Sequence, residues 1–112
     1  MAKSRVVVEE TAALASRLSR RLRKRGWSIV TAESCTGGLL SSTFTDISGA
    51  SHWFEQGWIT YNNDAKIREL GVEKSAFGDD VAGAVSHQVA LQMARGARYR
   101  SDANVSVAIT GI

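Results

Sequence analysis

The stretch WSIVTAESCTGGLLSSTFTDI, from Trp27 to Ile47, predicts a strand, a tight turn and a helix in succession. Its first four residues, WSIV, are mostly aromatic or β-branched, which is typical of a short buried strand. The adjacent glycines Gly37 and Gly38 indicate the turn ESCTGG, and a helical pattern resumes from Leu39 to Ile47. A strand that leads through a turn into a helix is a building unit of α/β folds.

The flanking segments extend this unit into an alternation of helices and strands. Apolar spacing predicts a first helix from Val6 to Arg25, closed by Gly26, with a buried face formed by Val7, Leu14, Leu18 and Leu22. Further along, the pattern predicts a strand at Trp58–Tyr61, preceded by a turn or bulge near Gly57, and then a helix at Asp64–Leu70 that is capped by Asn63 and ended by Gly71. After a polar connection, a helix is expected from the cap Ser86 to about Arg100, with Val89, Met93 and Ala97 on one face. The last predicted element is a strand at Asn104–Thr110. This order predicts an α/β fold, with helices layered on a mostly parallel or mixed sheet.

Composition favours one unexported domain. The chain has 112 residues, of which 44% are hydrophobic, so residues 1–112 can bury a single modest core. It contains no apolar run of the roughly 20 residues that a membrane helix needs, and no signal-peptide pattern. The single cysteine, Cys35, can form no internal disulfide and belongs to no multi-cysteine metal site. We therefore expect a cytoplasmic protein without a membrane segment, a metal or another cofactor.

Positive charge is concentrated near the end of the first predicted helix. The net charge is +3, and six of the 14 basic residues lie between Arg17 and Arg25. Such a cluster could bind nucleic acid, but it also complements the dipole at a helix C-terminus and suits a solvated helix face. We favour the second interpretation, so nucleic acid is not an expected partner.

The motif TAESCTGG, from Thr31 to Gly38, is the first candidate for chemistry. Unpaired N–H groups at the start of the following helix could bind a phosphate or stabilise an oxyanion, although the motif could also be only a structural turn. Ser34 and Cys35 are both eligible as the nucleophile. Glu33 could order the loop or merely flank the strand.

A base for such a nucleophile is the second question. His52 and His87 stand in no recognisable triad order. If Asn63 caps its helix, Lys66 lies in the first turn, where the helix dipole disfavours a cation. Partial burial would lower the pKa of Lys66 further and let the neutral amine accept a proton, unless the side chain is exposed and paired with a neighbouring acid. Tyr61 could donate a hydrogen bond near the nucleophile, or simply pack.

Three stretches in this order resemble the C-terminal domain family of the competence-damage-inducible protein CinA. They are the segment from Thr31 to Val72, which contains AESCTGG and YNNDAK, the segment GAVSHQVALQMARGAR from Gly83 to Arg98, and VAITGI from Val107 to Ile112. The resemblance extends from about Gly26 to Ile112 and implies the layered α/β fold of that family. Members of the family continue after TGI with further strands and a final helix, so we expect residues 1–112 to form a domain that is incomplete at its C-terminus.

The resemblance also implies an activity and a set of site residues. Stand-alone members are nicotinamide-nucleotide amidases, which convert nicotinamide mononucleotide (NMN) and water to nicotinic acid mononucleotide and ammonia in pyridine nucleotide salvage. By motif, Ser34 is the implied nucleophile of a Ser/Lys mechanism, Lys66 its base and Tyr61 an assisting residue. The implied substrate-binding residues are Glu33, Cys35, Thr36, Gly37, Gly38, Asn63 and Thr110.

Two hypotheses about function remain open at this stage. In the first, the chain is a Ser/Lys amidase that acts on NMN. In the second, it is a truncated, catalytically weak or inactive relative that serves as a nucleotide-binding or assembly module. The resemblance implies that the family region beyond TGI supplies a basic residue for the phosphate and covers part of the sheet. Without that cover we expect exposed apolar surface and hence a homo-oligomer.

Overall fold

A parallel three-stranded sheet forms the centre of the computed structural model, which describes residues 5–78 and 81–111, with side chains for residues 9–78 and 83–111. The strands are β1 (Ile29–Glu33), β2 (Phe54–Ile59) and β3 (Val105–Ile109), and β1 lies in the middle, in the order β2-β1-β3. The register pairs Glu33 of β1 with Ile59 of β2 and with Ile109 of β3, so the three strands end level with one another.

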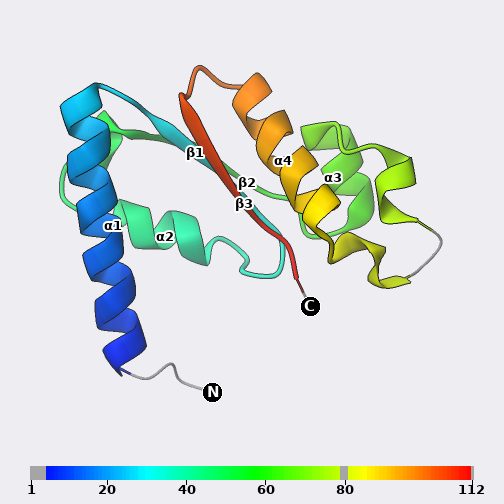
Figure 1. The fold of residues 1–112 in the computed structure, drawn as a ribbon, viewed down its shortest axis with the longest axis horizontal. Helices are drawn as coiled ribbons and strands as arrows, with labels where there is room; N and C mark the ends of the chain where they lie inside the picture. Colours follow the sequence, from blue (N-terminus) through cyan, green and yellow to red (C-terminus); the bar gives the residue numbers. More distant parts are fainter. Residues whose placement is uncertain (1–4, 79–80, 112) are drawn as a thin grey trace.

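Helices cover both faces of this sheet (Figure 1). The α-helices are α1 (Arg5–Arg25), α2 (Leu39–Thr45), α3 (Asn63–Leu70) and α4 (His87–Tyr99), and short 3₁₀ turns lie at Ala50–His52, Lys74–Phe77 and Val81–Ala84. In Figure 1, α1 and α2 lie on one side of the strands, and α3 and α4 lie on the other. The predicted α/β fold class, with layers of helices on a parallel sheet, is confirmed.

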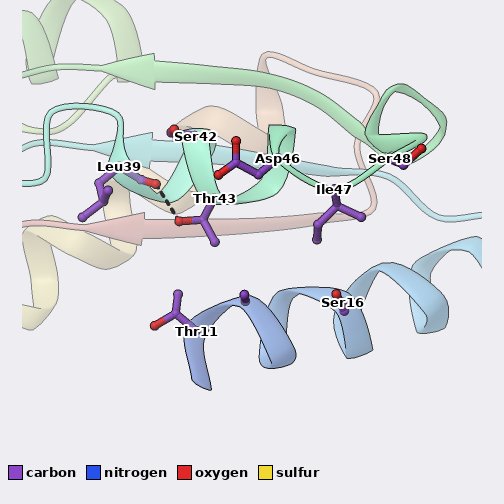
Figure 2. A pocket seen from close by; sticks show the side chains of 9 residues that line it. Thr11, Ser16, Leu39, Ser42, Thr43, Asp46, Ile47 and Ser48 are labelled. Atoms are coloured by element: carbon purple, nitrogen blue, oxygen red, sulfur yellow. Dashed lines mark hydrogen bonds between the residues drawn. The ribbon is translucent and has the colours of Figure 1, made fainter. Parts of the chain in front are cut away.

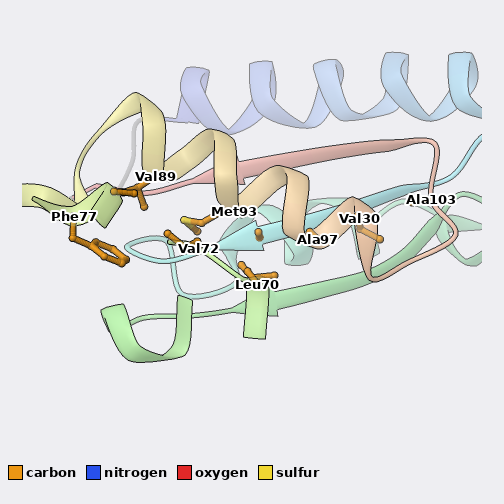
Figure 3. Close-up of a cluster of buried hydrophobic side chains, with 10 residues drawn as sticks. Val30, Leu70, Val72, Phe77, Val89, Met93, Ala97 and Ala103 are labelled. Carbon is orange, nitrogen blue, oxygen red and sulfur yellow. The ribbon is translucent and has the colours of Figure 1, made fainter. Parts of the chain in front are cut away.

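Two hydrophobic clusters hold the layers together, one on each face of the sheet. The cluster under α1 and α2 contains Ala15, Leu22, Ile29, Phe44, Ala50 and Trp53. The cluster under α3 and α4, drawn in Figure 3, contains Val30, Ala32, Leu70, Val72, Ala76, Phe77, Val89, Met93, Ala97 and Ala103. Ile29 and Val30 are adjacent in β1 yet belong to different clusters, because successive side chains of a strand point to opposite faces. The predicted cap Ser86 and the buried face of α4 are confirmed.

The predicted strand limits are wrong at both of the first two strands. β1 begins two residues after Trp27 and continues through Glu33, so Thr31 and Ala32 extend the strand and Glu33 belongs to it and not to the turn. β2 lies at 54–59, not 58–61, because its pairing with β1 fixes its position and the chain leaves the sheet before the helix cap. A register shift opposite Ile29 and Val30 leaves Glu55 as the extra residue, so a bulge exists but lies before Gly57.

Two helix details also differ from the prediction. The cap of α3 is Asn62, whose side chain accepts a hydrogen bond from Ala65 N at 2.7 Å, and not Asn63. On α1, Leu14 is 60% exposed, whereas Ala15 and Leu22 are buried. The expected face is therefore confirmed at Leu22 and at the partly buried Leu18, which pack in the cluster under α1 and α2, and is wrong at Leu14. The side chain of Val7 lies outside the described residues. Gly26, with φ of 68°, ends α1 as predicted.

Gly96 allows α4 to pack closely against the end of α3. A Cβ at this position would lie 1.8 Å from the carbonyl oxygen of Leu70, so an added methyl group must push the two helices apart. Helix propensity alone would make Gly96→Ala stabilising by about 1 kcal/mol. We expect instead that it lowers the free energy of unfolding by about 3 kcal/mol, because overpacking moves backbone.

Urea denaturation of Gly96→Ala beside Arg98→Ala measures this effect. Arg98 is exposed on the same helix, so its replacement changes propensity without a clash. A Gly96→Ala protein that is as stable as wild type or more stable would show that the two helices do not approach as described.

Candidate active site

The carboxyl ends of the three strands meet at one edge of the sheet, where α/β folds bind their ligands. Two backbone hydrogen bonds continue the strand ladders there, from Ser34 N to Ile109 O at 3.0 Å and from Thr60 N to Glu33 O at 2.9 Å. Ser34 therefore lies between the residues that follow β2 and β3. Ser34, the first residue after the central strand, thus has a segment of backbone beside it on each side.

Lys66 of α3 reaches the side chain of Ser34 at this edge. Lys66 Nζ lies 3.0 Å from Ser34 Oγ and 2.9 Å from the carbonyl oxygen of Tyr61, and it donates hydrogen bonds to both. Ser34 Oγ in turn donates to the same Tyr61 oxygen at 3.3 Å. Lys66 is 1% exposed and Ser34 is 4% exposed, so the pair is almost completely shielded from bulk water. Two residues that are 32 positions apart thus form one buried unit.

Burial lowers the pKa of Lys66, although the nearby Cys35 acts in the opposite direction. A lowered pKa increases the fraction of neutral amine, which can accept the proton of a serine hydroxyl at hydrogen-bond distance. The alternative of an exposed Lys66 paired with a neighbouring acid is wrong. Asp64 and Glu69 instead contact Arg68, at 3.2 and 3.1 Å. The arrangement is chemically suited to activate a serine nucleophile.

Neither Cys35 nor the Tyr61 side chain forms a hydrogen bond with this pair in the described part of the chain. Cys35 is exposed, and its Sγ atom lies beside Gly111, where a Cβ would approach it to 3.0 Å. The Tyr61 side chain is 75% exposed, and the contacts that this residue makes with Ser34 and Lys66 come from its carbonyl oxygen. An assisting role for the Tyr61 hydroxyl stays a prediction. The geometry favours Ser34 over Cys35 as the nucleophile.

The loop after Ser34 offers backbone donors to a ligand. Gly37 and Gly38 have φ of 60° and 106°, a region that favours glycine, and Gly37 N donates to Ser34 O at 3.1 Å. Within the described part of the chain, the N–H groups of Cys35, Thr36 and Gly38 donate no hydrogen bond. Backbone donors beside a nucleophile can stabilise the oxyanion of an acyl-transfer intermediate.

Glu33 lies behind this loop and has no exposed surface. Its carboxylate accepts hydrogen bonds from Leu40 N at 2.8 Å, from Ser41 N at 3.0 Å and from the hydroxyls of Thr36 and Ser41 at 2.7 and 2.6 Å. Burial alone would raise the pKa of Glu33, but the hydrogen bonds from Ser41, Thr36 and Leu40 outweigh it and lower the pKa. A carboxylate already occupies the start of α2, which argues against a phosphate cradle there.

Two threonines flank Ser34 at the same level of the sheet. Thr110, a predicted site residue, donates from its hydroxyl to Ala84 O at 2.7 Å. Thr60 is buried, and its hydroxyl has no partner among the described residues. Sequence analysis missed Thr60, although its place two residues after the core-facing Trp58 is a period-two signal for that face. Asn63, also a predicted site residue, is exposed at the start of α3, beside this edge.

A cavity with a different lining lies apart from Ser34 and Lys66. Figure 2 shows it between α1 and α2, with Thr11 and Ser16 on one wall and Thr43 and Asp46 on the other. Its volume is about 480 Å³, and its lining includes neither Ser34 nor Lys66. The hydroxyl of Thr43, in its lining, donates to Leu39 O at 2.9 Å. Among the described residues there is also no cluster of three metal-ligating side chains, and no helix that is long and apolar enough to cross a membrane.

The profile of the CinA C-terminal domain family matches residues 11–112. The chain belongs to this family. It is 46% identical over 99 residues to a Pseudomonas putida protein named nicotinamide-nucleotide amidohydrolase PncC, covering 88% of this chain and 61% of the relative. It is 50% identical over 95 residues to a CinA-like protein of Chlorobium limicola, covering 85% of this chain and 22% of the relative.

Solved structures of CinA proteins have the same fold. The competence/damage-inducible protein CihA from Agrobacterium tumefaciens superposes with a TM-score of 0.86 at 48% identity, over 91% of this chain and 61% of that structure. The CinA-type chain described here therefore spans about three fifths of the P. putida relative and of the A. tumefaciens structure. Family membership is established on this basis, and the activity of the chain itself is a separate question.

Proposed function

We propose that this chain is a nicotinamide-nucleotide amidohydrolase that uses Ser34 as nucleophile and Lys66 as general base. The observation that carries the proposal is the buried contact of 3.0 Å between Lys66 Nζ and Ser34 Oγ. Relatives that bear the amidohydrolase name support the choice of a nucleotide carboxamide as substrate. A neutral lysine beside a shielded serine is suited to acyl transfer without a metal or another cofactor.

The first half of the reaction forms an acyl-enzyme. Neutral Lys66 takes the proton of Ser34 as the serine oxygen attacks the carboxamide carbon of NMN, and the N–H groups of Cys35, Thr36 and Gly38 stabilise the oxyanion. Lys66 then gives this proton to the nitrogen of the tetrahedral intermediate. The C–N bond breaks, ammonia leaves, and an ester joins the substrate to Ser34.

The second half restores the enzyme. A water molecule gives a proton to neutral Lys66 and attacks the ester carbon, which forms a second tetrahedral intermediate. This intermediate collapses to the carboxylic acid, Lys66 returns its proton to the departing Ser34 oxygen, and the acid loses its own proton to water to give the carboxylate product. Buried Lys66 can serve in both directions because its contact with Tyr61 O holds Nζ in place beside Ser34 Oγ.

The alternative function is a nucleotide-binding or assembly module without turnover. The chain spans 61% and 59% of the P. putida and Escherichia coli amidohydrolases. The intact Ser34–Lys66 contact favours the amidase. For both functions, a homo-oligomer and a cytoplasmic location stay predictions.

Incubation of the purified chain with NMN, followed by enzymatic measurement of ammonia, tests the proposal. Nicotinic acid mononucleotide should appear in equal amount in the chromatogram, and the ribose and phosphate of the substrate should remain intact. Free nicotinamide serves as a matched substrate without the nucleotide. Absence of ammonia release, with NMN still binding in a calorimetric titration, would support the module instead.

The rate should depend on pH through Lys66. Because burial lowers the pKa of Lys66 from its ordinary value of 10.5, the neutral amine forms at a lower pH than on an exposed lysine. We expect kcat/KM to rise about tenfold per pH unit below the lowered pKa and to level off above it, before pH 10.5. A profile that keeps rising past that value would contradict a buried lysine base.

A further inference from the structure

We propose that Glu33 is a positioning residue for the amidase, and that its carboxylate holds the loop from Ser34 to Gly38 in its reactive conformation. The proposal rests on the function proposed for Ser34 and assigns Glu33 a role other than substrate binding. Glu33 has no exposed surface through which a substrate could reach it.

The sheet places Glu33 and Ser34 on opposite faces. They are adjacent at the end of β1, so their side chains alternate, and Ser34 points toward Lys66 of α3 while Glu33 points toward α2. The contact of Ser34 with Lys66 fixes the start of the loop that carries the backbone donors. The hydrogen bonds of Glu33 to Leu40 and Ser41 fix its end, and the two sets of contacts share no partner.

The hydrogen bonds of Glu33 join both ends of the loop. One carboxylate oxygen accepts from Thr36 Oγ1 inside the loop at 2.7 Å and from Leu40 N at the start of α2 at 2.8 Å. The other accepts from the backbone and the hydroxyl of Ser41. Gly38, the residue at the cap position of α2, makes no side-chain cap bond, so Glu33 supplies the cap from the preceding strand. Losing the carboxylate would release Thr36 and the first turn of α2 together.

Residues behind Glu33 are arranged to keep Ser41 in place. Thr31 Oγ1 and Ser41 Oγ are 2.8 Å apart, and Gly57 of β2 leaves the space that these hydroxyls occupy. A Cβ at Gly57 would lie 2.6 Å from Thr31 Oγ1 and 2.7 Å from Ser41 Oγ. Gly57→Ala therefore displaces the hydroxyls of Thr31 and Ser41 that support Glu33. These groups lie on the face of the sheet opposite Ser34, so the substitution changes no group that contacts the substrate.

The consequence for chemistry lies in the loop donors. Among the described residues, the N–H groups of Cys35, Thr36 and Gly38 donate no hydrogen bond, whereas Glu33 accepts from the N–H groups of Leu40 and Ser41 that follow the loop. Such donors act only when they lie at the oxyanion position before the reaction begins. A shift of about 1 Å in a catalytic group can cost roughly a hundredfold in rate.

Two measurements distinguish a positioning role of Glu33 from a role in substrate binding. The first is kcat and KM for ammonia release from NMN. The second is the rate at which a fluorophosphonate probe, which reacts with activated serines, labels Ser34. The variants are Glu33→Gln, Glu33→Ala and Gly57→Ala, with Thr43→Val as the matched control on α2, since Thr43 Oγ1 bonds only within that helix.

We expect Glu33→Gln to lower kcat and the labelling rate about tenfold and Glu33→Ala about a hundredfold, with KM changed less than about threefold. Gly57→Ala should resemble Glu33→Gln, and Thr43→Val should match wild type. A folded Glu33→Gln protein with wild-type kcat and labelling would overturn the proposal, as would a change in KM alone. If the Glu33 variants do not fold, Gly57→Ala decides by the same criteria.

The two proposals fail in different ways. If the probe labels Ser34 in a Lys66-dependent way but NMN is not hydrolysed, the proposed substrate is wrong. The positioning role of Glu33 is then tested by the labelling rates of its variants alone. A wild-type chain that shows neither labelling nor hydrolysis would overturn both.

Discussion

Replacement of Ser34 with alanine is expected to lower ammonia release from NMN by about a thousandfold or more. The change removes the oxygen that forms the acyl-enzyme, and the remaining loop donors can supply only a residual rate. The side chain of Ser34 is small and buried, so the alanine variant should fold with wild-type stability to within about 1 kcal/mol. The measurement is ammonia release under single-turnover conditions, beside thermal unfolding of the same preparation.

Cys35→Ala is the matched control for this prediction, since it removes the neighbouring candidate nucleophile from an exposed position. We expect it to retain activity within about threefold of wild type, because an exposed side chain beside the reactive pair contributes little to activation. Loss of activity in Cys35→Ala, with activity retained in Ser34→Ala, would reverse the assignment of the nucleophile.

Lys66→Met is expected to cost about as much activity as Ser34→Ala and yet to stabilise the fold. Methionine has a similar length and no charge, so it can fill the position of a side chain that is 1% exposed. The Ser34 hydroxyl keeps its hydrogen bond to Tyr61 O, so no new polar group is left unpaired. We expect a gain of about 1 kcal/mol in the free energy of unfolding near neutral pH.

The size of this stabilisation should change with pH in a defined direction. The lowered pKa of Lys66 in the folded chain means that the unfolded chain binds more protons between that pKa and 10.5. The stability of wild type therefore gains from this group as pH rises through that interval. The advantage of Lys66→Met should be largest below the folded pKa and should shrink toward pH 10.5. Chemical denaturation at several pH values measures it, and a Lys66→Met protein that is less stable at every pH would contradict the prediction.

Much of the site was predictable from the sequence because its residues lie at element ends. The turn at Gly37 and Gly38 and the short helix that carries Lys66 both follow from local chemistry, and the resemblance to CinA proteins links Ser34 with Lys66. The contact of 3.0 Å between the two side chains depends on where α3 packs against the sheet, which no local pattern determines.

The role of Glu33 was harder to foresee, and it shows what sequence patterns omit. A glutamate at the end of an apolar run favours a turn on propensity, so β1 was expected to stop before it. The strand continues because Leu40, Ser41 and Thr36 together satisfy the buried carboxylate. Such compensation comes from residues that follow a turn and cannot be inferred from the strand alone.

Tyr61 illustrates a second limit. The sequence draws attention to its hydroxyl, but the contacts with Lys66 and Ser34 come from its backbone carbonyl, which every residue type possesses. Thr60 is similar, since its burial beside the site depends on where β2 leaves the sheet. The alternation from Trp58 indicates the face of Thr60, but the expected strand continued to Tyr61, so the sequence did not place Thr60 at the end of β2.

Identification of the residue that carries the acyl group during turnover tests the central claim most directly. Wild-type chain is mixed with NMN, quenched in acid within the first turnover, digested with protease and mapped by mass spectrometry. The Ser34–Lys66 account predicts an ester on Ser34 that is absent from Lys66→Met and still present in Cys35→Ala. A thioester on Cys35, or ammonia release with no acylated peptide at any time point, would contradict it.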